Sequence, residues 1–159
     1  MEIKECSVML DTQYRMHRHI MDFSNRKFYK GNLKADDSVR DTVLSFDRER
    51  VLLSSAVNFI DTAGCGFTEI LNPESLSIAN PEEGLLLIRH LKLLLKQYEN
   101  DNHDEGAVKN LKSEKKRKPL TIGIISPYKE QVQYLSAQLG ADEDLKNHHS
   151  QIAIKTICE

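Results

Sequence analysis

The feature that most constrains the fold is a strand, helix and strand pattern in the C-terminal part of the chain. Residues 120–125 are rich in β-branched side chains and predict a strand, and residues 152–157 predict another. Ser126-Pro127 opens a helix between them, which we expect to run to about Gly140. Strands joined by such a helix are parallel. The chain is therefore predicted to be an α/β protein, with helices on both faces of a parallel sheet.

A leucine-rich segment predicts the longest helix. Asn80 is a good N-cap, Pro81 suits the first helical position, and Glu83 stands where a capping box needs an acid. Four apolar residues at helical spacing are expected to form its buried face, and four more leucines widen it: Leu85, Ile88, Leu91 and Leu95, with Leu86, Leu87, Leu93 and Leu94. If part of this stripe were exposed, self-association through apolar surface would follow.

The remaining segments give weaker patterns. Residues 19–28 predict a helix that Gly31-Asn32 ends. Residues 7–10 and 51–53 are short strand candidates, and residues 57–61 are a candidate buried strand ended by glycines. Residues 99–119 are polar throughout and are expected to be a solvated loop or a disordered insertion.

Composition limits the class of protein. The 159 residues suit one domain with one core, and 40% hydrophobic with 29% charged residues is typical of a soluble folded chain. The three cysteines are widely spaced, and no segment resembles a signal peptide or a membrane span, so we expect an intracellular protein, cytoplasmic or nuclear. The net charge of −2 predicts weak binding of nucleic acid by this chain alone.

Ligands of open parallel sheets collect at the carboxyl ends of strands. Three loops qualify here, at residues 11–17, 61–66 and 126–129. Each loop also has a purely structural explanation. The first could simply carry a surface arginine, the second could be a turn, and the third could be the start of a helix. The sequence holds no phosphate-binding loop and no nucleophile elbow, and its histidines and cysteines lack the spacing of a zinc site. No metal site is predicted, and an independent hydrolase is not supported.

The order of the motifs resembles the second RecA-like motor domain of superfamily 1 helicases. The block Gln13-Tyr14-Arg15-Met16-His17 and the block Ser126-Pro127-Tyr128-Lys129 are specific, and residues 59–64 and 80–83 fall between them in the family's order. The resemblance is to the branch that contains the nonsense-mediated-decay helicase and its DNA-acting relatives. It covers residues 8–157 and implies an incomplete RecA-like domain of the P-loop NTPase type.

The resemblance also implies roles for individual residues. In this family ATP and Mg²⁺ lie between two RecA-like domains, and the first domain holds the phosphates. Arg15 would reach across that cleft as an arginine finger, beside Tyr14 at the base or sugar and Gln13 in the same loop. Ser126, Tyr128 and Lys129 would contact single-stranded DNA or RNA, and movement would be 5′-to-3′.

Two departures from the family qualify these expectations. Arg18 follows His17 where the family usually has a proline. The sequence also ends at Glu159, where the family's next block, with a Gln-Gly pair, would begin. We therefore expect a part of a longer motor that has no ATPase activity by itself. A non-catalytic interaction or regulatory remnant of a helicase domain is the alternative.

Overall fold

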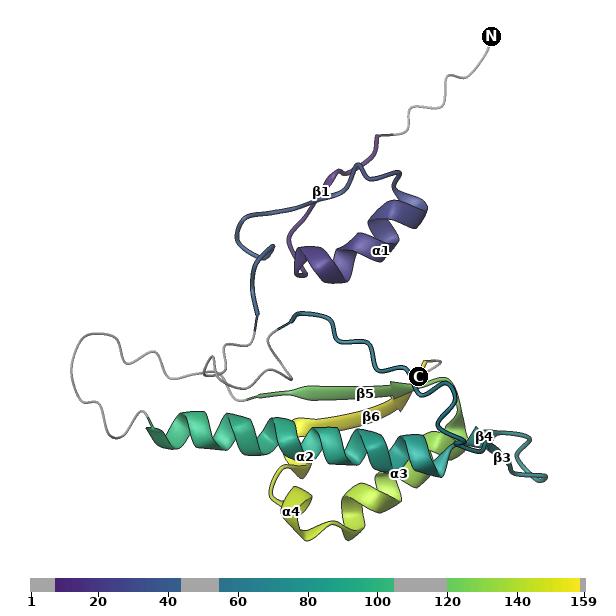
Figure 1. Cartoon of the computed structure of the whole chain (residues 1–159). Coiled ribbons are helices and arrows are strands. Elements are labelled where there is room, and N and C mark those ends of the chain that lie inside the picture. The colour runs from purple at the N-terminus through teal and green to yellow at the C-terminus, as the bar shows by residue number, and fades with distance from the viewer. Residues whose placement is uncertain (1–7, 44–54, 105–119, 158–159) are drawn as a thin grey trace. The chain divides into compact units, whose positions relative to one another are not determined.

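The structure is a computed structural model that describes residues 8–43, 55–104 and 120–157 (Figure 1). The chain divides into two compact units, an N-terminal unit of residues 1–60 and a C-terminal unit of residues 61–159. Among the described residues, no helix has both the length and the apolar character that crossing a bilayer demands.

The N-terminal unit contains one helix and a pair of short parallel strands. Strand β1 (Thr12–Gln13) pairs with β2 (Lys34–Ala35), and α1 (Arg18–Phe28) connects them. The predicted helix at residues 19–28 is thus confirmed, with its start one residue earlier. It ends as predicted, because Gly31 adopts a φ of 78° while its N–H donates to the carbonyl oxygen of Asn25 at 3.1 Å.

The C-terminal unit contains a hairpin followed by a βαβ arrangement. Its elements are β3 (Ile70–Leu71), β4 (Ile78–Ala79), α2 (Pro81–Asp104), β5 (Ile122–Ser126), α3 (Lys129–Ala141), α4 (Glu143–Lys146), the 3₁₀ turn η2 (His149–Gln151) and β6 (Ile152–Thr156). Strands β3 and β4 are antiparallel, whereas β5 and β6 are parallel with Ile122 opposite Ile152. The predicted strand–helix–strand unit is confirmed, although α3 begins at Lys129 instead of at Ser126-Pro127.

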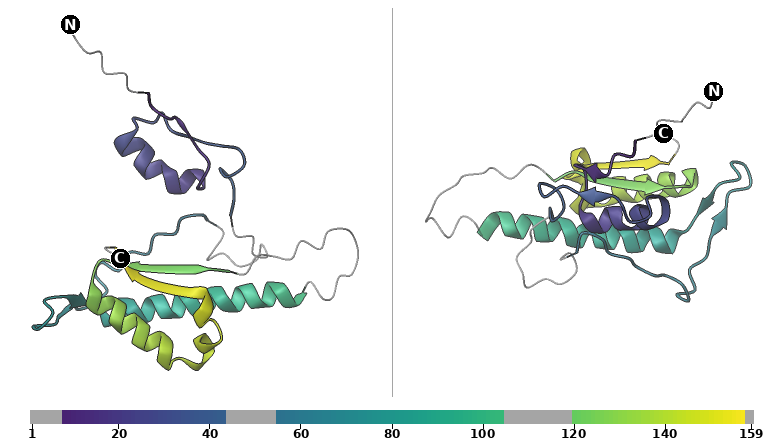
Figure 2. Two further views of the ribbon diagram at one scale, coloured as in Figure 1. Left: turned by 180° about the vertical axis from the view of Figure 1, so that it is seen from behind. Right: turned by 90° about the horizontal axis from the view of Figure 1, so that it is seen from above.

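The core of the C-terminal unit lies between the β5–β6 sheet and its helices. Buried residues of α2, α3 and α4 pack with Ile124 of β5 and with Leu120, which precedes β5. The full set is Ile88, Leu91, Leu95, Leu120, Ile124, Leu135, Leu139 and Leu145. Figures 1 and 2 show α2 and α3 running along the β5–β6 sheet. Alternate strand residues face away from this core, and Ile125 is 71% exposed. Within the described residues of the C-terminal unit one face of β5–β6 is covered by helices, and coverage of both faces stays a prediction.

Helix α2 starts as predicted, and three of the four residues of its predicted buried face, Ile88, Leu91 and Leu95, are buried. The side chain of Asn80 accepts from the backbone N–H of Glu83 at 3.0 Å, which confirms the cap. The second half of the expected capping box is absent, because the N–H of Asn80 donates to Gln131 Oε1 at 2.7 Å. Gly84 is buried where Leu85 was predicted to be, and Leu85 and Leu93 are exposed. Self-association through these leucines stays a prediction.

Three other segment predictions differ from the structure. Residues 57–61 form no strand and Phe59 is 87% exposed, because no described strand lies beside them to pair with their backbone. Residues 8–10 are likewise irregular. Helix α2 continues to Asp104, so the polar segment begins as helix, not as loop. The predicted strand at residues 51–53 and the polar residues 105–119 lie outside the described residues.

Candidate functional site

The first predicted loop connects β1 to α1 and is held by one glutamine side chain. We call residues 14–17 the arginine loop. Gln13 Oε1 accepts from the backbone N–H of Arg15 at 2.8 Å and of Met16 at 2.9 Å. Gln13 Nε2 donates to the carbonyl oxygen of Met16 at 2.8 Å. These bonds fix the backbone on both sides of the arginine, so Gln13 orders the loop whatever the loop binds.

The arginine loop presents two large side chains to solvent. Tyr14 is 68% exposed and Arg15 is also exposed. Within the described residues, the guanidinium of Arg15 has neither an ion pair nor a hydrogen bond. By contrast, His17 is buried and caps α1, because its Nδ1 accepts from the backbone N–H of His19 at 3.1 Å. The loop therefore has a fixed backbone, an anchored end and a free cation.

The carboxylates near the start of α1 are paired with groups other than the guanidinium of Arg15. Hydrogen bonds from Ser38 hold the pKa of Asp36 below its ordinary value. A hydrogen bond from Arg40 likewise lowers the pKa of Asp41, which Arg18 also pairs with at 3.2 Å. These carboxylates are ionised at neutral pH and matched by cations or donors.

The second predicted loop, residues 61–66, is a compact turn attached to α2. Its ends are drawn together by the N–H of Ala63, which donates to Asp61 Oδ1 at 2.9 Å, and by the N–H of Cys65, which donates to the Thr62 carbonyl oxygen at 3.1 Å. Thr62 Oγ1 donates to Glu83 Oε1 at 2.7 Å. The loop is thus positioned by the first turn of α2, a long-range contact that the sequence did not predict.

The third predicted loop leads from β5 into α3, and its donors are partly used inside the protein. Ser126 is only 7% exposed, and its Oγ accepts from the N–H of Tyr128 at 3.2 Å. Ser77 Oγ, in the turn before β4, accepts from the N–H of Glu130 at 3.2 Å. Lys129 is exposed and Tyr128 is about half-exposed. The side chains of these two residues are therefore the accessible groups of the loop.

The structure brings the second and third loops into one connected region. The carbonyl oxygen of Asn80 accepts from Gln131 Nε2 at 3.1 Å, which joins the start of α2 to the start of α3. Ser75 Oγ adds a bond to Glu130 Oε1 at 2.8 Å. The arginine loop belongs to the other unit. Sequence reasoning missed the hairpin residues Ser75 and Ser77, because nothing local in the sequence indicates contacts more than fifty positions away.

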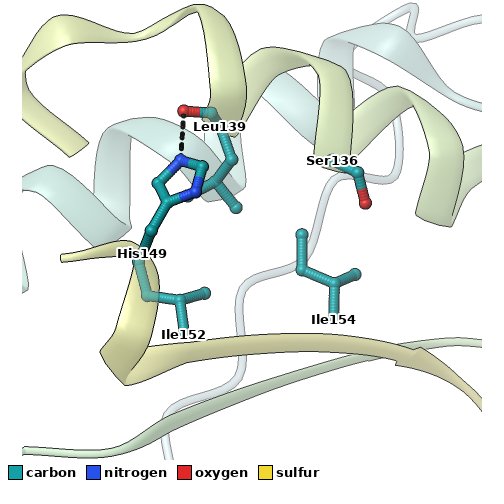
Figure 3. A pocket seen from close by; sticks show the side chains of 5 residues that line it. All are labelled: Ser136, Leu139, His149, Ile152 and Ile154. Atoms are coloured by element: carbon teal, nitrogen blue, oxygen red, sulfur yellow. Dashed lines mark hydrogen bonds between the residues drawn. The ribbon is translucent and has the colours of Figure 1, made fainter. Parts of the chain in front are cut away.

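A cavity of about 200 Å³ lies between α3, η2 and β6 of the C-terminal unit (Figure 3). It is lined by Ser136, Leu139, His149, Ile152 and Ile154, and His149 Nε2 lies 3.1 Å from the carbonyl oxygen of Leu139. Three of its five lining residues are aliphatic, and Ser136 and His149 add polar atoms. Within the part of the chain that the structure describes, no three His, Cys, Asp or Glu residues are grouped as a metal site would require.

Comparison with known proteins gives the family. The model of the AAA domain family matches residues 1–159. The DNA-binding protein SMUBP-2 of Rattus norvegicus is 31% identical over 154 residues, which cover 94% of this chain and 13% of that protein. The ATP-dependent helicase MJ0104 of Methanocaldococcus jannaschii, described as uncharacterized, is 31% identical over 140 residues, covering 82% of this chain and 18% of that protein. Helicase SEN1 of Saccharomyces cerevisiae is 31% identical over 133 residues, covering 84% of this chain and 5% of that protein.

Proposed function

We propose, from the premise that this chain belongs to the AAA domain family and is a superfamily 1 helicase-type domain, that it forms the second motor half of an ATP-dependent helicase or translocase. The chain spans less than a fifth of the length of these relatives. The phosphate-binding loop and the catalytic acids are then supplied by a first RecA-like domain, since this sequence contains neither. The branch of the nonsense-mediated-decay helicase and movement 5′-to-3′ remain part of the same proposal.

The free guanidinium of Arg15 carries the proposal. ATP and Mg²⁺ bind to the first domain, and Arg15 reaches the γ-phosphate when the two domains close. A guanidinium is always charged, and its planar set of donors matches two phosphate oxygens at once, so it stabilises charge that builds up during transfer. Tyr14 borders the base or sugar, and Gln13 keeps the loop in shape.

The loop between β5 and α3 is proposed to contact single-stranded DNA or RNA. Lys129 supplies a positive charge for a phosphate, and the ring of Tyr128 offers a face for a base to stack on. Ser126 is nearly buried and accepts a backbone hydrogen bond, so its part is to set the turn that presents these two side chains. With a net charge of −2, the chain depends on the first domain for most of the affinity.

The test is turnover by a protein that carries this domain together with its ATP-binding partner domain. Arg15→Ala should lower kcat for ATP hydrolysis by roughly 10³-fold while the Kd for ATP changes little, because a finger acts in the transition state. Arg26→Ala is the matched control, since Arg26 is an exposed arginine of α1 that pairs with Asp22 at 2.5 Å. Unchanged turnover in Arg15→Ala would show that Arg15 does not act on ATP.

A non-catalytic interaction module is the second candidate, and the net charge of −2 favours it. Fluorescence anisotropy with labelled single-stranded DNA and RNA separates the two. A motor domain should bind a strand in a salt-dependent way that weakens when Lys129 is changed to Ala. An interaction module should show no such dependence on Lys129, and Arg15→Ala should leave hydrolysis unchanged.

A further inference from the structure

One segment holds both ends of the arginine loop. We call residues 36–41 the brace. The backbone N–H of Asp36 donates to the carbonyl oxygen of Gln13, immediately before the loop, at 2.9 Å. The backbone N–H of Arg18, immediately after the loop, donates to the carbonyl oxygen of Arg40 at 3.1 Å. The loop therefore leaves and returns to the same short piece of chain.

The brace is itself a tight turn. The N–H of Arg40 donates to the carbonyl oxygen of Asp36 at 2.9 Å, and Asp36 Oδ1 accepts from the backbone N–H of Ser38 at 3.0 Å. The guanidinium of Arg40 binds two carboxylates of the brace, Asp37 at 2.8 Å and Asp41 at 3.0 Å. Each of these bonds joins residues within five positions, so the brace can hold its shape without help from the loop.

Arg18 ties the brace to α1 with two groups. In addition to its backbone N–H, its Nη2 lies 3.2 Å from Asp41 Oδ1. A proline at this position, which superfamily 1 relatives usually have, provides neither group because it has no N–H and no charge. The double attachment is thus specific to the residue that this sequence carries at position 18.

We propose that Arg18 and the brace position the arginine loop, so that Arg18 acts on catalysis through the backbone of Arg15. This inference rests on the proposed function of Arg15. Fixing both ends of a short loop to one turn removes most alternative backbone paths, and a catalytic group must be held closely to be effective. Gln13 fixes the middle of the loop, and the brace fixes its two ends.

The energetics separate positioning from general stability. The side chains of Arg18 and Asp41 are 55% and 52% exposed, and exposed ion pairs contribute little to stability because water screens them. Changing Arg18 should therefore leave global unfolding almost unaltered. What it alters is the freedom of the loop to which Arg18 is attached.

Two variants of the 159-residue chain separate the contribution of the Arg18 ion pair from that of the Arg18 backbone N–H. Arg18→Ala removes the ion pair and keeps the N–H, whereas Arg18→Pro removes both. Proline is tolerated at this first helical position, and His17 before it already has φ −56° and ψ 145°, which a following proline requires. Arg26→Ala again serves as the control, because its ion pair to Asp22 lies within α1 and does not touch the brace.

Hydrogen exchange of the Arg15 and Met16 amides is the first measurement, since both donate to Gln13 Oε1. Exchange should accelerate roughly fivefold in Arg18→Pro, as loss of one hydrogen bond would produce, and less in Arg18→Ala. The control should match the parent chain. Unchanged exchange at both amides in Arg18→Pro, with α1 intact by circular dichroism, would overturn the brace whatever Arg15 does.

Hydrolysis in the two-domain protein is the second measurement. Arg18→Pro should lower kcat for ATP by about tenfold with the KM nearly constant, since misplacing a catalytic group costs turnover. Arg18→Lys, which keeps the N–H and a charge, should restore most of it. If exchange responds as expected but Arg15→Ala has no effect on turnover, the brace stands and the proposed function fails. If Arg15→Ala is inactive while Arg18→Pro retains full turnover, the positioning role is wrong.

Discussion

Replacing Gly84 by alanine should destabilise the C-terminal unit, although alanine is the better helix former. Gly84 lies in the first turns of α2, where α3 approaches. A Cβ built there would be 2.6 Å from Tyr134 Cε1 and 2.9 Å from Tyr134 Cδ1, and 3.3 Å from Gln131 Nε2. The first two distances are too short for carbon atoms in contact. Tyr134 would therefore have to turn its ring, or the two helices would have to separate.

The magnitude follows from two opposing terms. Crowding a packed interface by one methyl group costs about 1 to 3 kcal/mol. Glycine in a helix is less favourable than alanine by about 1 kcal/mol, so part of the cost is recovered. The net destabilisation is then about 1 kcal/mol. In a Tyr134→Ala background the two shortest contacts are removed and only Gln131 Nε2 at 3.3 Å remains, so the same change at Gly84 should stabilise by up to about 1 kcal/mol.

Urea unfolding followed by circular dichroism measures each variant. The control is Gly140→Ala in α3, where an added Cβ meets nothing within 4 Å, so alanine should stabilise in either background. The expected signature is a change of sign at Gly84 alone when Tyr134 is removed. If Gly84→Ala stabilised the parent chain as much as it stabilised the Tyr134→Ala chain, the close approach of α2 and α3 would be refuted.

Two further predictions concern the same unit. Leu135 is 1% exposed, so Leu135→Ala should lower the free energy of unfolding by about 2 to 5 kcal/mol, whereas Leu76→Ala at a 76% exposed position should change it by less than about 0.5 kcal/mol. Lys92 lies 2.5 Å from Asp142 and holds the pKa of that carboxyl below its ordinary value. The ion pair therefore stabilises the fold above about pH 4, and this stability is lost as the pH falls through the folded pKa of Asp142. In Lys92→Met the free energy of unfolding should fall less steeply with pH in this acid range. An equally steep fall in the variant would contradict a stabilising role of the ion pair.

The sequence predicted the β5–α3–β6 unit because its signals are local. β-Branched runs, a helix between them and the turn residues at its ends all lie close together in the chain. Parallel pairing then follows from the connection itself, and the register with Ile122 opposite Ile152 agrees with it. The Asn80 cap was predictable for the same reason, since a cap involves residues three positions apart.

The predictions that were wrong depend on contacts with residues far away in the chain. Residues 57–61 are as apolar as a strand, yet a strand also needs a neighbouring backbone, and the described residues provide none. The hydrophobic pattern predicted that Leu85 is buried. In the structure Tyr134 of α3 packs directly against Gly84, so the residue without a side chain is buried and Leu85 is exposed. Ser77, which accepts from the start of α3, gave no signal because the two segments meet only in the folded chain.

In the candidate site, too, the local features were predicted from the sequence and the long-range contacts were not. The sequence alone predicted the loop that carries Arg15, and it placed Gln13 beside that arginine. The brace was not predicted, because nothing in residues 36–41 by themselves connects them with residues 13 and 18. Residues 36–41 show no periodicity, yet they supply the two backbone contacts that fix the ends of the loop.

The distribution of charge around the arginine loop explains why Arg15 is the arginine to test. Three acidic residues lie in the brace, and each is already engaged: Asp36 by Ser38, Asp37 by Arg40, and Asp41 by Arg40 and Arg18. An arginine bound to its own carboxylate would have to break that pair before it could reach a phosphate. Within the described residues Arg15 has no such pair to break, while its backbone is fixed by Gln13. A fixed backbone that carries a free cation is what a group needs if it is to act on a ligand held by another domain.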